Sequence, residues 1–392
     1  LAAPAWAQVL GPVQGLPGVQ VPDAGLPQLP NTLPPRRVDT LLRQPLALTR
    51  QLQIDTLLRK EPRRVDVDPH GAPILRGEFL AMGLSAVQRD ALRALGFVVA
   101  NETSAEATLG MAVVTLHDTR GRRTSRAMRA LRQAAPDATF TYQHIYLPAG
   151  DRTRDEAPTT ASPSAAPRRV GLIDGGVDPA DPALARARIE QHGCTTAAAS
   201  RHGTAVAARL VAGDADTVYA ADLWCGDTVG GATSNLVDAL AWMAREHVAV
   251  INISLVGPDN PVLARAVQAM VARGHVLVSA VGNDGPAAPP LFPAAYPGVI
   301  GVSAVDAHDR VLPESGSGPQ VAFCALGLVG TGRGALRGTS FAAPIVARRA
   351  AQLLDAPHAD ASAQIEQRLA TEARDLGRPG RDSRCGYGLL SP

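Results

Sequence analysis

From residue 168 onward, short apolar segments alternate with segments of helical periodicity. Apolar runs of four to seven residues, joined by helical connections, are typical of parallel strands that are buried on both faces. The pattern predicts an α/β fold with a mostly parallel sheet and helices on both faces. The expected strands are 170–173, 217–223, 250–254, 275–280, 299–304 and 320–325, and the expected helices lie near 204–211, 234–246, 261–273 and 342–354.

A smaller unit of a different pattern precedes this one, at residues 74–147. Its order is β-α-β-β-α-β, which predicts a small α+β domain of ferredoxin-like arrangement. The strands are expected at 74–84, 97–100, 111–116 and 139–147, and the helices at 85–95, capped by Ser85, and near 125–134. Residues 148–167, rich in Pro, Ser, Thr and Ala, are interpreted as a linker to the domain at 168–392.

The first residues indicate export. Ala5-Trp6-Ala7 has the small-x-small form of a signal-peptidase site, so residues 1–7 are interpreted as the remnant of a signal peptide, with an ordinary Ala-rich terminus as the alternative. Residues 8–73 combine a Pro-rich segment with a basic, leucine-spaced helical stretch. Packing of that stretch on the neighbouring domain is favoured over a partner or membrane surface. No apolar run approaches the roughly 18–20 residues of a membrane span, so no transmembrane segment is predicted.

The cysteine count agrees with a periplasmic or secreted protein. Four cysteines, Cys194, Cys225, Cys324 and Cys385, all follow residue 190, and an even number fits two disulfides in an exported chain. Three connectivities are open. We favour Cys194–Cys225 with Cys324–Cys385, because each joins neighbours along the chain.

The net charge argues against a nucleic-acid-binding site, and the spacing of cysteines and aspartates argues against a metal site. The net charge of +2 is too small to indicate a nucleic-acid partner. No Cys-x-x-Cys pair and no Asp-rich loop occurs, so no metal ligands are predicted.

Residues 338–344, Gly-Thr-Ser-Phe-Ala-Ala-Pro, are the most informative stretch. They place Ser340 where a helix begins, with Pro344 expected in its first turn. The free N–H groups and the positive dipole end of such a helix favour an oxyanion beside the hydroxyl. A serine nucleophile also needs a base and a group that orients that base.

Three further segments supply the missing groups. Asp174 ends an apolar strand and is followed by two glycines, His202 lies at the start of a helix of small residues, and Asn283 follows a strand. The amide of Asn283 is expected to donate a hydrogen bond to the oxyanion beside the Ser340 N–H. Asp178 and Asp181 are weaker candidates for the carboxylate, and His192 is rejected as the base because Cys194 and a polar loop follow it instead of a helix.

Together and in this order, these motifs resemble the subtilisin-like serine peptidases (subtilase family), and the resemblance covers nearly all of 168–392. It implies a subtilisin-like fold, the catalytic triad Asp174, His202 and Ser340, and an oxyanion hole of Asn283 and Ser340. It also implies hydrolysis of polypeptides with no cofactor required for catalysis. Structural calcium, which many relatives bind, is left open without support from the sequence. The residues expected to bind substrate are Ser254, Leu255, Val256, Ala280, Val281 and Gly282.

Two departures from the family pattern stand out. Val256 replaces a usual glycine and is expected to narrow the S1 or S4 subsite, and Ala205 replaces a common second histidine. Asp284 is placed at the rim of S1, where a carboxylate would favour a basic P1 residue.

The position of the N-terminal domain resembles that of subtilase prosegments, which chaperone and inhibit their enzymes. The chain is therefore expected to be a self-processing zymogen cut in the linker, near Arg168-Arg169, with retention as a regulatory module as the alternative. A catalytically silent binding or regulatory protein on the same fold is the alternative function.

Overall fold

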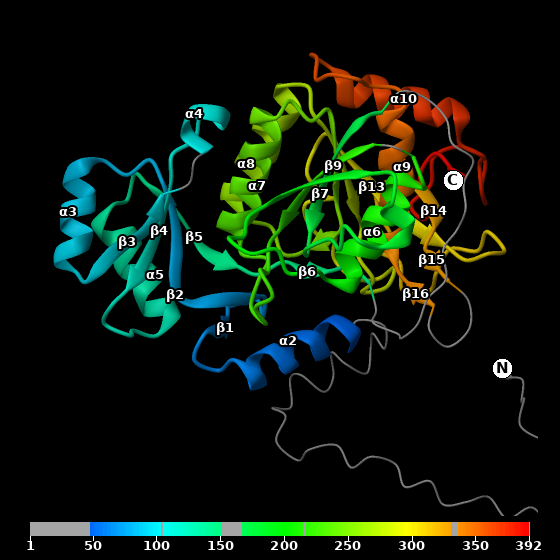
Figure 1. The fold of residues 1–392 in the computed structure, drawn as a ribbon. Coiled ribbons are helices and arrows are strands. Elements are labelled where there is room, and N and C mark those ends of the chain that lie inside the picture. The colour runs from blue at the N-terminus through cyan, green and yellow to red at the C-terminus, as the bar shows by residue number, and fades with distance from the viewer. Residues whose placement is uncertain (1–47, 103–104, 151–166, 215, 331–334, 392) are drawn as a thin grey trace, which may run out of the picture. The chain divides into compact units, whose positions relative to one another are not determined.

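The computed structural model describes residues 48–102, 105–150, 167–214, 216–330 and 335–391 (Figure 1). All of them belong to one unit, Arg43–Pro392. The expected signal-peptide remnant at 1–7, most of the 8–73 segment and most of the linker lie outside the described residues. Among those described, no helix combines the length and the apolar character needed to cross a bilayer.

The N-terminal part forms an antiparallel sheet of five strands in which the ferredoxin-like order is found. β5 and β4 flank β2, β3 pairs with β4, and the short β1 pairs with the start of β2. The strands are β1 Val65–Val67, β2 Pro73–Met82, β3 Phe97–Glu102, β4 Val113–Asp118 and β5 Thr139–His144. The helices are α3 Ala86–Ala94, α4 Ala105–Leu109 and α5 Thr124–Ala134. As expected, Ser85 caps α3, in a reciprocal capping box with Gln88.

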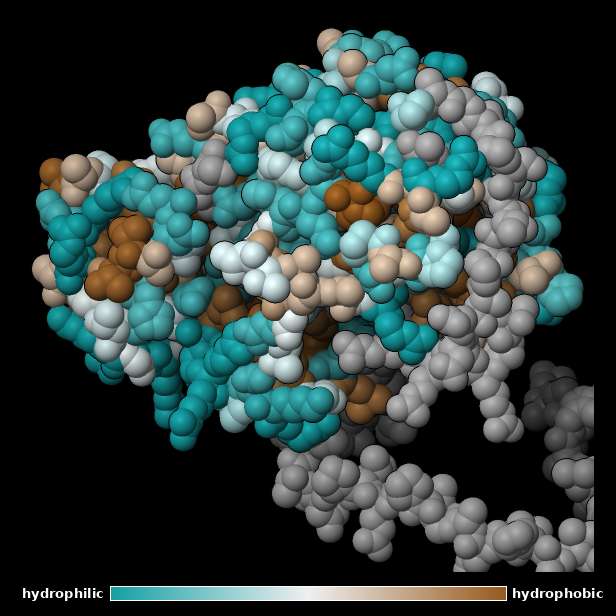
Figure 2. All heavy atoms as spheres, viewed as in Figure 1, coloured by the Kyte–Doolittle hydropathy of each residue, from teal (hydrophilic) through white to brown (hydrophobic). Residues whose placement is uncertain are grey.

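The last strand of this sheet is shorter than the sequence predicts. β5 ends at His144, and residues Leu147–Pro148 form a separate strand, β6, which leaves the sheet and pairs with the second part of the chain. The surface over α3 and β3 carries an apolar area, to which the exposed Val87, Val98 and Val99 contribute (Figure 2).

The second part contains the predicted parallel sheet, with seven strands in the order β14-β13-β12-β10-β7-β9-β8. Every neighbouring pair in it is parallel. The strands are β7 Arg169–Asp174, β8 Arg188–His192, β9 Thr217–Asp222, β10 Val250–Ile253, β12 Val276–Ala280, β13 Val299–Val305 and β14 Val321–Leu326. Three short strands lie outside it: β11 Leu255–Val256, β15 Leu328–Val329 and β16 Leu336–Arg337.

Helices cover both faces of this sheet (Figure 1). They are α6 Arg201–Val211, α7 Thr233–Arg245, α8 Pro261–Ala272, α9 Thr339–Ala351 and α10 Ala361–Glu372, with a 3-10 turn at Pro182–Leu184. Alternate strand residues point to opposite cores, because side chains alternate along a strand. Leu172 packs in the core of α6 and α9, and Ile173 packs in the core of α7 and α8.

β8 and α10 are among the elements that were not predicted. The edge strand β8 is polar and only half-buried, so it lacks the apolar run of its neighbours. α10 is amphipathic, with Ile365 and Leu369 buried on one side. The four cysteines form the two favoured bonds, Cys194–Cys225 and Cys324–Cys385.

α2, Leu48–Lys60, carries the described part of the basic leucine-spaced stretch. Leu57 and Leu58 pack in an apolar cluster with Leu147 of β6 and Val229 of the second part. This is the packing on the neighbouring domain that the sequence favours over a membrane surface.

Candidate active site

Asp174 and His202 meet at the carboxyl end of the parallel sheet. Asp174 ends β7 and is buried, and Nδ1 of His202 lies 2.9 Å from each of its carboxylate oxygens. The backbone N–H of Gly175 also donates to this carboxylate. β7 has β10 on one side and β9 on the other, so the site lies where the strand order changes direction, the usual place for a site in such a sheet.

Two glycines allow helix α6 to approach β7 closely enough for this contact. A Cβ on Gly203 would lie 2.2 Å from the carbonyl oxygen of Gly175, and one on Gly176 would lie 2.2 Å from that of Ala198. Ser200 caps the helix by accepting from the N–H of Gly203. The helix therefore begins at Arg201, a few residues earlier than predicted, and His202 lies within its first turn.

Ser340 is fully buried in the first turn of α9. Its hydroxyl donates to the carbonyl oxygen of Ser254 at 3.1 Å rather than to His202. Nε2 of His202 is buried with no hydrogen-bond partner among the described residues, and its ring centroid lies 5.2 Å from that of Phe341. The structure thus brings all three predicted triad residues to one place, with the serine hydroxyl turned to Ser254.

The expectation for Pro344 is wrong. Because α9 starts at Thr339, Pro344 lies inside the helix and not in its first turn. A proline there cannot donate to the carbonyl oxygen of Ser340, four residues earlier. The hydroxyl of Ser254 donates to that oxygen instead, at 3.0 Å, so Ser254 satisfies the acceptor that the proline leaves free.

Asn283 and Ser340 converge on one carbonyl oxygen of the chain itself. Nδ2 of Asn283 donates to the oxygen of Ala149 at 2.6 Å, and the backbone N–H of Ser340 donates to it at 3.0 Å. Oδ1 of Asn283 accepts from the N–H of Thr339, which orients the amide. A Cβ on Gly338 would lie 2.7 Å from Nδ2 and 2.9 Å from the Ala149 oxygen, so this position requires glycine.

The segment before Ala149 lies between β11 and Gly231, a position that we call the groove. β6 pairs with β11 in antiparallel register, Leu255 opposite Pro148 and Val256 opposite Leu147. The N–H of Ala149 donates to the carbonyl of Ser254, and on the other edge the N–H of Tyr146 donates to the carbonyl of Gly231. Residues 146–149 are thus held between two neighbours as an added strand.

The other predicted substrate residues differ in their surroundings. Ala280 and Val281 pack in apolar clusters, and Gly282 donates its N–H to the hydroxyl of Thr339. The narrowing expected from Val256 stays a prediction. Tyr146 is fully buried, and its hydroxyl donates to the carbonyl of Pro258. Room for the ring comes from the residue after Val256, because a Cβ on Gly257 would lie 2.4 Å from it.

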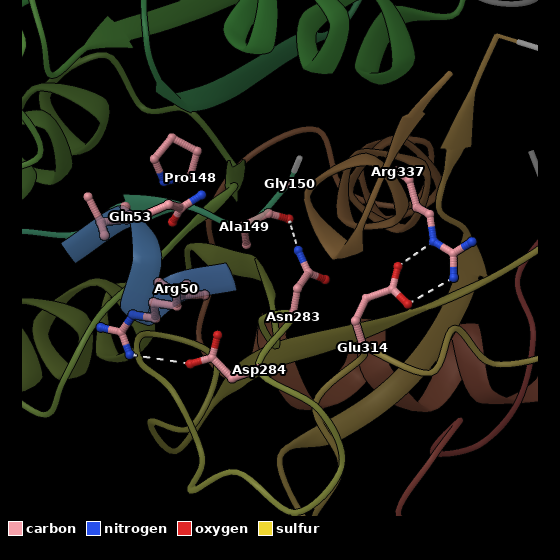
Figure 3. A pocket seen from close by; sticks show the side chains of 11 residues that line it. Arg50, Gln53, Pro148, Ala149, Gly150, Asn283, Asp284, Glu314 and Arg337 are labelled. Atoms are coloured by element: carbon pink, nitrogen blue, oxygen red, sulfur yellow. Dashed lines mark hydrogen bonds and ion pairs between the residues drawn. The ribbon is translucent and has the colours of Figure 1, made fainter. Parts of the chain in front are cut away.

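A cavity of about 230 Å³ adjoins Ala149 (Figure 3). Two ion pairs lie at it: Arg50 of α2 with Asp284, and Arg337 with Glu314. Burial raises the pKa of the Asp284 carboxyl, and the charge of Arg50 offsets part of this. Sequence reasoning missed Arg50, Gly231, Gly257 and the Ala149 carbonyl, since only the tertiary structure brings them to the site.

One group of possible metal ligands occurs in the described part of the chain: Cys194, Asp222 and Cys225. The two sulfurs are joined in a disulfide, so neither is a free thiolate. The group therefore gives no support for a metal site.

Comparison with known proteins identifies the family. Residues 168–388 match the model of the subtilase family, peptidase S8. The chain belongs to the subtilase family. It is 32% identical over 171 residues to the minor extracellular protease Epr of Bacillus subtilis (strain 168), covering 41% of this chain and 26% of Epr. It is 30% identical over 232 residues to subtilisin E of the same strain, covering 53% of this chain and 61% of subtilisin E. The chain thus spans less than two thirds of the length of these relatives.

The fold is also found in a larger solved protein. Fervidolysin from Fervidobacterium pennivorans, a keratinolytic enzyme related to subtilisin, has a TM-score of 0.65 and 19% sequence identity, covering 83% of this chain and 61% of fervidolysin. This likeness confirms the subtilisin-like α/β fold with its parallel sheet.

Proposed function

We propose that this chain is an exported serine endopeptidase, made as a zymogen that cleaves its own Ala149–Gly150 bond. The observation that carries the proposal is the position of the Ala149 carbonyl. Its oxygen accepts from both Asn283 and the N–H of Ser340, while residues 146–149 lie along β11 as a substrate would. Two donors aimed at the carbonyl of an extended segment are the arrangement that stabilises a tetrahedral oxyanion.

Hydrolysis would proceed by acyl transfer. The Ser340 hydroxyl turns from Ser254 toward His202, gives its proton to Nε2, and attacks the carbonyl carbon. Asp174 holds the imidazole by Nδ1 and stabilises its cation, and Asn283 with the Ser340 N–H binds the oxyanion. His202 then protonates the leaving amine, the bond to Gly150 breaks, and a water activated by His202 releases the acyl group as an acid.

Gly150 fits the leaving side of this bond. A Cβ at this position would lie 2.9 Å from the Phe341 ring and 3.1 Å from Nε2 of His202, so a larger residue would push the base away. A cut near Arg168-Arg169 is less favoured. Arg168 is mostly buried in ion pairs with Asp214 and Asp216, and Arg169 begins β7. The segment would have to leave the sheet to be cut.

The N-terminal sheet would act as inhibitor and folding template. The strand β6, which follows this sheet, fills the groove. The sheet itself contacts the peptidase domain through polar side chains of β5. Gln143 bonds with Ser234, and His144 with Asn260. While these contacts last, no other polypeptide can pair with β11. Release would free the groove for polypeptide substrates.

Export is supported by the two disulfides, since such bonds persist in oxidising compartments. With the Ala5-Trp6-Ala7 motif they support a periplasmic or secreted enzyme. The reaction needs only protein groups, so no cofactor is proposed, and structural calcium stays an open expectation.

Mass spectrometry of the full chain tests the proposal. Wild type is expected to yield a fragment that begins at Gly150, and Ser340→Ala, expressed alongside, is expected to stay whole. A fragment that begins at Arg169 would refute the assigned bond. If wild type also stayed whole and a fluorophosphonate did not label Ser340, the chain would be the catalytically silent regulatory protein of the alternative function.

Tyr146 offers a separate test of inhibition. Tyr146→Ala removes a fully buried ring, which should cost about 3 kcal/mol of the free energy that binds the cleaved N-terminal part to the peptidase domain. Retention of that part should therefore weaken about 10²-fold. Tyr146→Phe keeps the ring and loses only the bond to Pro258, so about tenfold or less is expected. The measurement is co-elution of the two fragments in size-exclusion chromatography over a dilution series. Equal retention of all three forms would contradict this role.

A further inference from the structure

The cavity beside Ala149 contains an ion pair that joins the two halves of the proposed zymogen. A guanidinium nitrogen of Arg50 lies 3.5 Å from a carboxylate oxygen of Asp284, and both side chains are 15% exposed. Arg50 belongs to α2, before the Ala149–Gly150 bond, whereas Asp284 directly follows the oxyanion donor Asn283. Figure 3 shows the guanidinium and the carboxylate facing each other below β6.

Asp284 depends on Arg50 for a counter-ion. Its burial disfavours the ionised carboxylate, so a cation within reach is needed to keep the charge. The other cation at the cavity, Arg337, pairs with Glu314 instead, through two hydrogen bonds. Among the described residues, Arg50 is therefore the ion-pair partner that Asp284 has.

Within the described part of the chain, the guanidinium group of Arg50 does not use all of its hydrogen-bond donors. Its Nε is buried with no hydrogen-bond partner among the described residues. A contact of 3.5 Å with one oxygen is also looser than the paired hydrogen bonds that arginine and carboxylate can form. A basic side chain that entered the cavity from another direction could thus replace Arg50.

The residue at the proposed cleavage point leaves space for such a side chain. Ala149 lines the cavity together with Val256 and Asn283, and its own methyl group is too short to fill about 230 Å³. A longer side chain at position 149 would extend into the cavity, whose wall includes the carboxylate of Asp284. Cleavage after Ala149 would cut the link between Arg50 and the peptidase domain, and departure of α2 would leave Asp284 without its cation.

We infer that this cavity is a subsite for a basic P1 side chain, with Asp284 as its specificity-determining residue, and that Arg50 lines it and holds the Asp284 carboxylate in the uncut chain. The inference rests on the proposed function and names its substrate class: polypeptides with Lys or Arg before the cleaved bond. α2 is then a second inhibitory element, which neutralises the carboxylate of the specificity subsite while β6 fills the groove.

The first experiment needs no catalysis. In the full-length Ser340→Ala chain, Arg50→Met removes the cation and keeps an unbranched apolar side chain. Into that chain we introduce Ala149→Lys or, as a matched control, Ala149→Met. The lysine form is expected to melt about 2 °C higher than the methionine form, because the introduced ammonium group supplies the missing charge. Asp284→Asn should erase the difference. Equal melting temperatures with Asp284 intact would overturn the inference.

The second experiment uses the same variants with Ser340 restored and follows cleavage at 149–150. With Arg50→Met, the Ala149→Lys chain should be cut about tenfold faster than Ala149→Met, and with Arg50 present this advantage should shrink. Equal rates in the Arg50→Met chains would overturn the inference. If no chain were cut, wild type included, while the melting difference held, the proposed self-processing would fail and the basic subsite would stand.

Discussion

Replacing His202 by alanine is expected to slow peptide-bond hydrolysis about 10⁶-fold, the scale seen when a serine peptidase loses its base. Among the described residues, the Ser340 hydroxyl donates to the carbonyl oxygen of Ser254, which is not a base, so without the imidazole its proton has no acceptor at neutral pH. Asp174→Asn should cost less, about 10⁴-fold, because the base remains but is held in the wrong tautomer. Initial rates on a denatured protein substrate, at matched concentrations of processed enzyme, provide the measurement.

His192→Ala is the matched control for this prediction. His192 ends β8, and its ring stacks on Trp242 with centroids 4.5 Å apart, in a contact that serves packing. Its loss should leave the rate within a few-fold of wild type. A His202→Ala chain that processed itself at the wild-type rate would show that another group takes the proton.

Replacing Asn283 should lower turnover about 10²- to 10³-fold, with little change in KM. Its Nδ2 donates to the carbonyl of Ala149, which would become the oxyanion in the proposed reaction, and this bond would strengthen as negative charge develops. Asn283→Ala loses the donor and also the acceptor for the Thr339 N–H. The measurement is kcat and KM on a peptide substrate, with the rate of self-cleavage as a second readout.

Asn283→Asp separates these two losses. Aspartate keeps the acceptor for Thr339, so the start of α9 should stay in place, but it has no donor and adds a negative charge beside the oxyanion. It should therefore be at least as slow as Asn283→Ala while its melting temperature stays closer to wild type. An aspartate variant that was more active than the alanine variant would point to a structural role for Asn283.

Glycines explain much of why these donors and acceptors can converge. Gly203 lets α6 reach β7, Gly338 makes room for the oxyanion donor, and Gly257 makes room for Tyr146. At each position a Cβ would lie within 2.2–2.7 Å of backbone or side-chain atoms that belong to other segments. The sequence contains these glycines without revealing which ones matter, because the atoms that need the space come from distant parts of the chain.

The sequence alone determined the parallel sheet, the ferredoxin-like order before it and the motifs around Asp174, His202, Asn283 and Ser340. These depend on local patterns: apolar runs, helix starts and the residue types that acyl transfer needs. It failed at β8 and at the start of α9, where a polar edge strand and an internal proline depart from those patterns. In the proline's case, Ser254 supplies the missing hydrogen bond from 86 residues away.

Only the tertiary structure decided what fills the groove. Which carbonyl lies between Asn283 and Ser340, and which arginine faces Asp284, depends on how β6 and α2 pack against the peptidase sheet. Asn283 and Ala149 are 134 residues apart, and contacts at such separations have no local pattern in the sequence, because each partner is an ordinary residue until the fold brings the two together.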